Sequence, residues 1–99
     1  MNTVHPDKVH RDRIQKLTDL PNVGPSVAHD LQRLGIAIPE QLKGQLAFSL
    51  YQQLCTLDQT RHDPCVLDVL ISVVRFMDGE PAQSWWQYTA ERKQRYPDL

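Results

Sequence analysis

The chain has 99 residues, of which 40% are hydrophobic and 23% are charged, and its formal net charge at pH 7 is −1. This length suits one domain with a single modest core. No apolar run approaches the roughly 18 residues of a membrane span, and the polar N-terminus lacks an apolar signal core. We therefore expect a cytoplasmic protein. The near-neutral charge argues against strong binding to duplex DNA, which usually needs a basic face.

Five helical segments and no strand are predicted, and together they indicate an all-α bundle. The first segment runs from about Lys8 to Asp19, and Pro21 helps to stop it. Its apolar residues lie near helical spacing, so we expect them to share one buried face. They are Val9, Ile14, Leu17 and Leu20.

The second helix is predicted from about Pro25 to Leu34, because proline suits the first helical position and Gly35 suits a left-handed terminator. A short helical turn, again started by proline and stopped by glycine, is predicted over residues 39–44. The third helix is predicted over about residues 47–57, with leucines along one side.

The fourth helix begins with an aspartate cap at Asp63 and a proline at Pro64, and it runs to about Met77. It is apolar almost all round, so it should be the central and most buried helix. A capping-box pattern over residues 84–87 begins the last helix, which runs to about residue 95. We expect one domain over residues 1–99, with loose ends at 1–7 and 96–99.

The turn between the first two helices is the most informative feature of the chain. Such a tight hairpin needs positive φ angles, which Gly24 supplies and Asn22 tolerates. The amides of Gly24, Ser26 and Val27 then lie at a helix start, where they have no intrahelical partners. Free amides and the helix dipole together attract an anion such as a phosphate. Binding of this kind is independent of base sequence.

The segment Leu20-Pro21-Asn22-Val23-Gly24-Pro25-Ser26-Val27-Ala28 resembles the helix-hairpin-helix motif of DNA repair and replication proteins. The resemblance implies a SAM-like helical bundle. Asn22 stands where the motif usually has glycine, and Ser26 stands where many DNA-binding members carry lysine. In DNA-binding members, hairpin carbonyls hold a monovalent cation. The matching carbonyls here are those of Thr18, Leu20 and Val23.

A wider resemblance, over roughly residues 12–93, is to the small bacterial "pathogenicity locus" family, whose related members carry the label mitomycin resistance protein. Several separated blocks agree in order. They are Gly35-Ile36, Pro39 to Gly44, Leu50 to Cys55, Asp63 to Val69 and Ser84-Trp85-Trp86. The C-terminal domain of the competence regulator TfoX is a more distant resemblance, with a similar Leu-Pro-Asn-x-Gly-Pro turn.

Two functions follow from these patterns. The first is a non-enzymatic module that contacts the DNA backbone without sequence preference, in DNA repair or damage tolerance. Its contacts would come from the hairpin and three flanking cations, with His29 as a further candidate. The predicted contact residues are Asn22, Val23, Gly24, Ser26, Val27, Lys16, Arg33 and Lys43. Each cation is also readily explained as a solvated surface charge, and the hairpin as a purely structural turn.

The second function is a protein-protein interaction adaptor, suggested by the near-neutral charge and by the adjacent Trp85 and Trp86. Adjacent helical residues diverge by about 100°, so one tryptophan could be exposed for a partner or a base. Packing of both against the central helix is the alternative.

The remaining chemistry-bearing residues give no sign of an enzyme, a cofactor or a small-molecule substrate. Cys55 and Cys65, with His62 nearby, lack the four ligands of a zinc site and an oriented base, so buried inert thiols are expected. Asp68 and Arg75 interrupt the apolar helix and mark either a solvent-facing stripe or a buried polar contact. The run from residue 91 to 95 reads as a solvated helix end. The expected partner is DNA or an unidentified protein, and no membrane.

Overall fold

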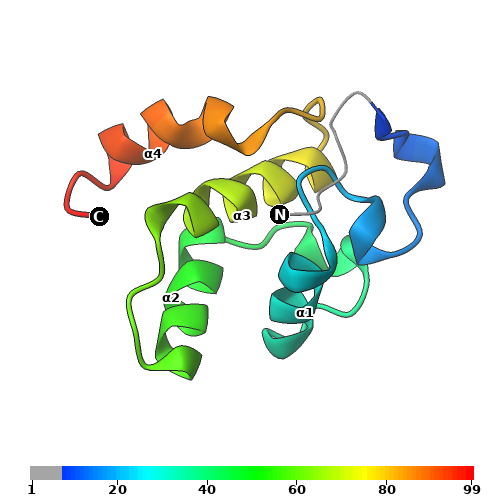
Figure 1. Cartoon of the computed structure of the whole chain (residues 1–99). Helices are drawn as coiled ribbons and strands as arrows, with labels where there is room; N and C mark the ends of the chain where they lie inside the picture. Colours follow the sequence, from blue (N-terminus) through cyan, green and yellow to red (C-terminus); the bar gives the residue numbers. More distant parts are fainter. Residues whose placement is uncertain (1–7) are drawn as a thin grey trace.

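The computed structural model describes residues 8–99, and within that range the regular elements are all helical. The α-helices are α1 (Pro25–Arg33), α2 (Ala47–Asp58), α3 (Pro64–Met77) and α4 (Thr89–Arg95) (Figure 1). Short 3₁₀ turns precede α1 and lie between α1 and α2 and between α3 and α4. These are η2 (Arg11–Arg13), η3 (Leu17–Asp19), η4 (Pro39–Leu42) and η5 (Trp85–Tyr88). The predicted all-α class is confirmed, with four α-helices in place of five.

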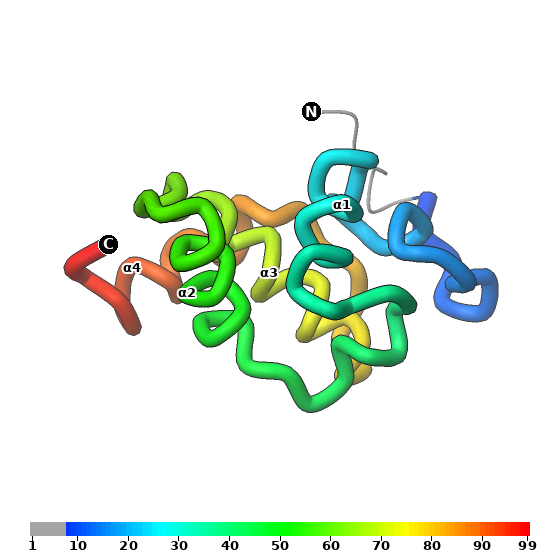
Figure 2. Tube along the Cα trace, turned by 90° about the horizontal axis from the view of Figure 1, so that it is seen from below, coloured from blue at the N-terminus to red at the C-terminus, as the bar shows by residue number. Residues whose placement is uncertain are grey.

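The apolar helix α3 lies at the centre of the bundle, as the sequence predicts. It contacts α2, α4, η4 and η5. Figure 1 shows α4 on one side of α3 and both α1 and α2 on the other, and Figure 2 shows α1 and α2 side by side in front of α3. Residues 67–74 of α3 are buried without a break. This continuous burial follows from a helix that has apolar side chains on nearly every face.

The helix predicted over Lys8 to Asp19 is wrong, because η2 and η3 are separate 3₁₀ turns with extended residues between them. Ile14 and Lys16 are both extended, with ψ of 106° and 165°. The Asp19 carboxylate accepts hydrogen bonds from the amides of Gln15 and Lys16, both at 3.0 Å. An aspartate that bonds nearby amides competes with helical hydrogen bonding. Leu17 is nevertheless buried, as expected.

The second helix behaves as predicted. Pro25 occupies the first helical position of α1, and Gly35 has the left-handed φ of 87° that ends it. The chain then turns back, since the amide of Ile36 donates to the carbonyl of Leu31 at 2.9 Å. Ile36 is buried, so this turn fixes the C-terminal end of α1 against the core.

The last helix is shorter than predicted, because η5 occupies residues 85–88 and α4 begins only at Thr89. The Ser84 side chain makes no capping hydrogen bond. The polar residues of α3 explain the position of α4. Asp68 is fully buried, and Arg92 donates to it at 3.0 Å from Nε. Thr89 Oγ1 donates to the same carboxylate at 2.8 Å.

These contacts bear on two predictions from the sequence, one for Arg92 and one for Asp68 and Arg75. Arg92 was expected within a solvated helix end, but it is buried, because a buried carboxylate needs a paired cation. Of the two alternatives for Asp68 and Arg75, the buried polar contact is correct for Asp68, whereas Arg75 is half-buried. Arg75 pairs with Glu91 of α4, so two ion pairs join α3 to α4.

The two ends of the chain differ in what the structure describes. The predicted loose end at 1–7 lies outside the described residues. At the other end, Tyr96 stacks on Phe48 with ring centroids 4.3 Å apart. Leu99 packs against the core, and Arg61 donates to the carbonyl of Asp98. These contacts hold residues 96–99 against the bundle.

Candidate nucleic-acid interface

The hairpin that leads from η3 into α1 is held in place by the side chain of Asn22. Its Nδ2 donates to Ser72 Oγ of α3 at 3.0 Å and to the carbonyl of Gln83 at 2.8 Å. Asn22 has a φ of 65°, which asparagine tolerates better than most residues. Gly24 has an extended backbone with φ of −96°, so the positive φ expected there is wrong. Asn22 therefore supplies both the turn and its attachment to the bundle.

The start of α1 carries amides that have no acceptor among residues 8–99. The first helical bond runs from the Ala28 amide to the Gly24 carbonyl at 2.9 Å, and no side chain caps the helix. The amides of Gly24, Ser26 and Val27 make no hydrogen bond in this part of the chain. Gly24 is buried, Val27 is half-buried and Ser26 is exposed. The accessible part of the predicted anion cradle is thus the first turn at Ser26 and Val27.

The hairpin side chains themselves face inward. Val23 is fully buried and Asn22 nearly so, so neither side chain is available to a ligand. The carbonyl of Leu20, one of three matched by resemblance to a cation site, accepts the amide of Val23 at 3.4 Å. The other two matched carbonyls belong to Thr18 and Val23. A ligand at this place would therefore meet main-chain groups rather than side chains.

The three cations predicted to flank the phosphate do not gather at the hairpin. Lys16 is exposed and directly precedes η3, the first arm of the hairpin. Lys43 lines a separate hollow with Arg11 and Phe76 at the end of α3. His29 is exposed on α1. Of the predicted cations, Lys16 is the one that the chain places next to the hairpin.

Arg33 has its charge balanced by carboxylates of its own chain. It pairs with Asp30 at 3.1 Å and with Asp58 of α2. The Asp58 carboxylate, and then that of Asp30, raise the pKa of the Arg33 guanidinium. Asp58 also lies 2.6 Å from Nε2 of His62. Arg33 therefore joins α1 to α2 and adds little positive potential for a phosphate.

An apolar cavity of about 180 Å³ opens beside the start of α1. Its walls come from α1, α2, α3 and η5. They are Ser26, Val27, Asp30, Leu31, Leu34, Leu54, Cys65, Val66, Val69, Leu70 and Trp85. No local pattern predicts this cavity, because its lining residues come from four separate elements of the chain.

The two tryptophans differ in their exposure to solvent. Trp85 is half-buried and lines the cavity, whereas Trp86 is 59% exposed. Their rings meet edge to face, with centroids 5.7 Å apart and an interplanar angle of 83°. The alternative in which both pack against the central helix is wrong for Trp86, and the arrangement with one tryptophan exposed is the one found.

Arg11 is a structural residue that sequence reasoning missed. Its guanidinium lies 4.0 Å from the centroid of the Phe76 ring, and it donates to the carbonyls of Phe76 and Glu80 at 2.7 and 2.6 Å. A cation at a helix C-terminus interacts favourably with the dipole and the last carbonyls. No local pattern predicts this, since the partners are more than 60 residues apart.

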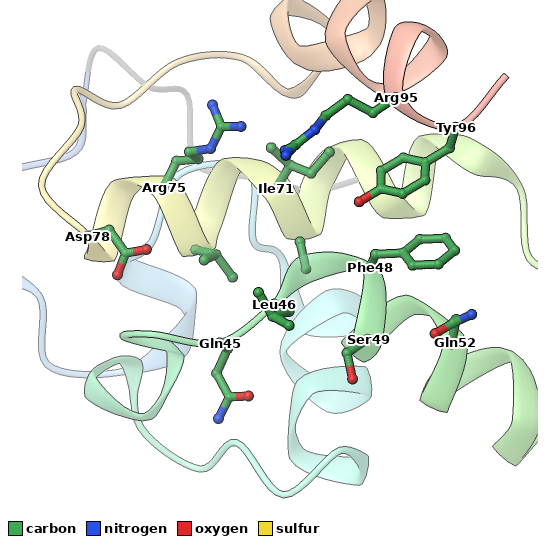
Figure 3. Close-up of a pocket in the computed structure, with 12 residues that line it drawn as sticks. Gln45, Leu46, Phe48, Ser49, Gln52, Ile71, Arg75, Asp78, Arg95 and Tyr96 are labelled. Atoms are coloured by element: carbon green, nitrogen blue, oxygen red, sulfur yellow. The ribbon is translucent and has the colours of Figure 1, made fainter.

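A second and larger hollow, of about 450 Å³, lies between the start of α2 and the ends of α3 and α4 (Figure 3). Phe48 and Tyr96 form one wall, and Arg75 and Arg95 lie along its edge. Both guanidinium groups pair with Glu91. Their charge is thus already balanced within the chain, and among the described residues that line this hollow no cation is left free to attract an anion.

The thiols and carboxylates show no metal-binding arrangement within residues 8–99. No group of three His, Cys, Asp or Glu residues there is placed to hold a metal ion. Cys55 accepts the His62 amide at 3.4 Å. Burial, and then the nearby Asp63 carboxylate, raise the pKa of the Cys65 thiol. Cys55 and Cys65 are both free and half-buried rather than fully buried.

None of the described helices is long and apolar enough to cross a membrane. The comparisons with known proteins agree with the resemblance seen in the sequence. No solved structure matches the chain. The mitomycin resistance protein McrB of Streptomyces lavendulae is 44% identical over 77 residues, which cover 78% of this chain and 73% of that protein. A family model described as "Pathogenicity locus" matches residues 10–94, so this chain belongs to the pathogenicity locus family.

Proposed function

We propose that the protein is a non-enzymatic module that contacts the nucleic-acid backbone without sequence preference through the start of α1. In this proposal η3, the hairpin and α1 act as a helix-hairpin-helix unit whose first helix is reduced to a 3₁₀ turn. The observation that carries it is the uncapped first turn at Ser26 and Val27, whose amides have no acceptor among residues 8–99.

The chemistry of this helix start suits a phosphate. Amides without partners and the positive end of the helix dipole both favour a negative group. The hairpin is already fixed by the Asn22 bonds to Ser72 and Gln83, so little ordering is needed on binding. Lys16 precedes η3 and supplies a nearby cation.

The charge distribution predicts weak and salt-sensitive binding. Arg33 is paired with two carboxylates, and the net charge of the chain is −1. Few phosphates would therefore be neutralised by one copy, so the binding should be weak and should decrease further as the salt concentration rises. The name of the relative, a mitomycin resistance protein, supports a place in damage tolerance or DNA repair.

The proposal is tested by titrating fluorescently labelled duplex and single-stranded DNA at low and moderate salt. Ser26→Glu places a carboxylate on the first turn of α1, where it favours the helix but repels a phosphate. We expect roughly threefold or greater loss of affinity at low salt. Ser26→Lys, the residue that many motif members carry here, should tighten binding.

Ser49→Glu is the matched control, because it makes the same charge change on the first turn of α2. It should leave binding nearly unchanged. An absence of binding to any DNA at low salt would contradict the proposal for this chain. Equal losses in the two glutamate variants would show a general charge effect instead of contact at α1.

A protein-interaction adaptor is the second candidate, and the exposure of Trp86 is the observation that favours it. Aromatic side chains are enriched at protein interfaces. A photo-crosslinker placed at position 86 should then capture one defined protein in cells. Loss of that product in a Leu57→Ala control, which changes another exposed side chain, would argue against a specific interface at Trp86.

A further inference from the structure

The cavity beside α1 shares its edge with the proposed phosphate contact. Ser26 and Val27 belong both to the uncapped first turn and to the cavity wall. Trp85 supplies an aromatic wall, and aliphatic side chains of α1, α2 and α3 form most of the remainder. Asp30 is the one residue of the lining whose side chain is ordinarily charged at neutral pH.

We propose that this cavity takes an unpaired nucleobase, so that the preferred ligand is single-stranded nucleic acid or a strand with an exposed base. The inference rests on the proposed function, which it narrows to a substrate class. The juxtaposition is a ring-sized apolar cavity whose wall includes Ser26 and Val27, the residues of the uncapped first turn, and a nucleotide presents an aromatic ring attached to a phosphate.

The size and walls of the cavity suit a planar ring. Aliphatic cavities of about 150 Å³ admit benzene in other proteins, and this one measures about 180 Å³. A base that enters it would lie against the indole of Trp85, which contributes stacking without regard to sequence.

The charges at the cavity also complement a nucleotide. The helix start at Ser26 attracts the phosphate. The Asp30 carboxylate accepts a hydrogen bond from Arg33 through Oδ1. A carboxylate also accepts hydrogen bonds from base amino groups such as N4 of cytosine. An apolar peptide side chain would fill the walls but would leave the helix start without an anion. The nucleotide therefore matches more of the site than a peptide does.

Duplex DNA cannot place a base in this cavity without first unpairing and unstacking it, which opposes binding. The same ring in a flexible single strand is already available. Single strands should consequently bind more tightly than duplexes of equal phosphate number, despite the higher charge density of the duplex.

The test compares three labelled probes by fluorescence anisotropy at low salt. They are a short deoxycytidine strand, an abasic strand with the same number of phosphates, and a duplex. We expect the deoxycytidine strand to bind roughly tenfold or more tightly than either of the others, as base stacking on one aromatic side chain would give. Equal affinity for the deoxycytidine and abasic strands would overturn the inference while leaving backbone contact intact. If no probe binds, the proposed function itself fails.

Two variants localise the effect. Trp85→Ala removes the aromatic wall, and Val27→Phe puts a larger side chain on the cavity wall and so reduces the space for a base. Both should lower the affinity for deoxycytidine strands to that for abasic strands, while circular dichroism shows an intact fold. Leu46→Ala changes a side chain that is 73% exposed and lies outside this cavity, so it is the control. Unchanged deoxycytidine binding in a folded Val27→Phe protein would overturn the inference.

Cys65 gives a second readout, because its side chain lines the cavity. In a Cys55→Ser background it is the only thiol of the chain, and its alkylation is followed at alkaline pH because the pKa of the thiol is raised above its ordinary value. The deoxycytidine strand should slow its alkylation several-fold, whereas the abasic strand should not. Equal rates under saturating deoxycytidine strand would place the base elsewhere and contradict the inference.

Discussion

The two sides of α3 are built differently. On the side of α4, Asp68 is buried with Arg92 and Thr89 as its partners. Tyr88, which directly precedes Thr89, is also buried. On the side of α1, an apolar cavity remains open and the first turn of the helix has amides without partners among residues 8–99. On the first side, the side chains of Asp68, Thr89 and Arg92 fix α4 on α3. The second leaves groups for a ligand, which is why the candidate site lies there.

Removal of one partner from the α4 side should have the largest effect on stability. Arg92→Ala leaves the buried Asp68 carboxylate without its cation, which we expect to cost about 3–5 kcal/mol in urea unfolding. The double variant Asp68→Leu with Arg92→Met removes both charges and should recover most of that loss. A loss of less than about 1 kcal/mol for Arg92→Ala would contradict the burial of this pair.

On the α1 side, Asn22→Ala should cost about 2–4 kcal/mol, because it forces alanine into a left-handed conformation and removes two hydrogen bonds. Asn22→Gly keeps the conformational freedom and loses only the bonds, so it should cost less. Urea unfolding of the two variants separates backbone strain from side-chain attachment. Equal costs would mean that the φ angle of Asn22 contributes little.

Filling the cavity should stabilise the α1 side slightly. Val66 is half-buried and lines the cavity. Val66→Leu adds one methylene group to that space, and we expect a gain of about 0.5–1 kcal/mol in thermal unfolding. A loss of stability instead would show that the cavity walls are too rigid for the added group. The same variant should weaken binding of deoxycytidine strands if a base enters there.

Low pH should reduce the stability that Asp19 gives to the first arm of the hairpin. Hydrogen bonds from the amides of Lys16 and Gln15 hold the pKa of Asp19 below its ordinary value of 3.8. Between the lowered folded value and the unfolded value, the unfolded chain binds more protons, so stability falls as the pH decreases through this range. The contribution is fully present above the unfolded pKa. Asp19→Asn should flatten the dependence of the unfolding midpoint on pH below about 4, and an unchanged slope would rule out this source.

The elements that the sequence predicted well are those with local start and stop signals. As expected, α1 begins at Pro25 and is ended by the left-handed Gly35. Asp63 caps α3 by accepting a hydrogen bond from the Cys65 amide at 3.0 Å. The apolar composition of α3 predicted its central position. These features depend on residues within a few positions of one another, so they are visible in the sequence.

The predictions that failed depend on contacts between distant parts of the chain. The sequence around Arg92 is typical of a solvated helix end, but its guanidinium donates to the buried carboxylate of Asp68, which lies 24 residues earlier in the chain. Residues 8–19 have apolar residues near helical spacing, yet the local bonds of Asp19 replace helical bonding there. The candidate amides at Ser26 and Val27 were predictable from the turn, whereas the cavity lined by Trp85 was not, because three other elements complete it.

The attachment of the hairpin also sets when it can form during synthesis. Asn22 bonds to Gln83, which lies 61 residues later in the chain. A ribosome that has released only the first two thirds of the protein has not yet supplied this acceptor. The turn should therefore acquire its final shape late, together with the tryptophan-bearing segment, and a shortened chain that ends before Gln83 should leave α1 poorly anchored.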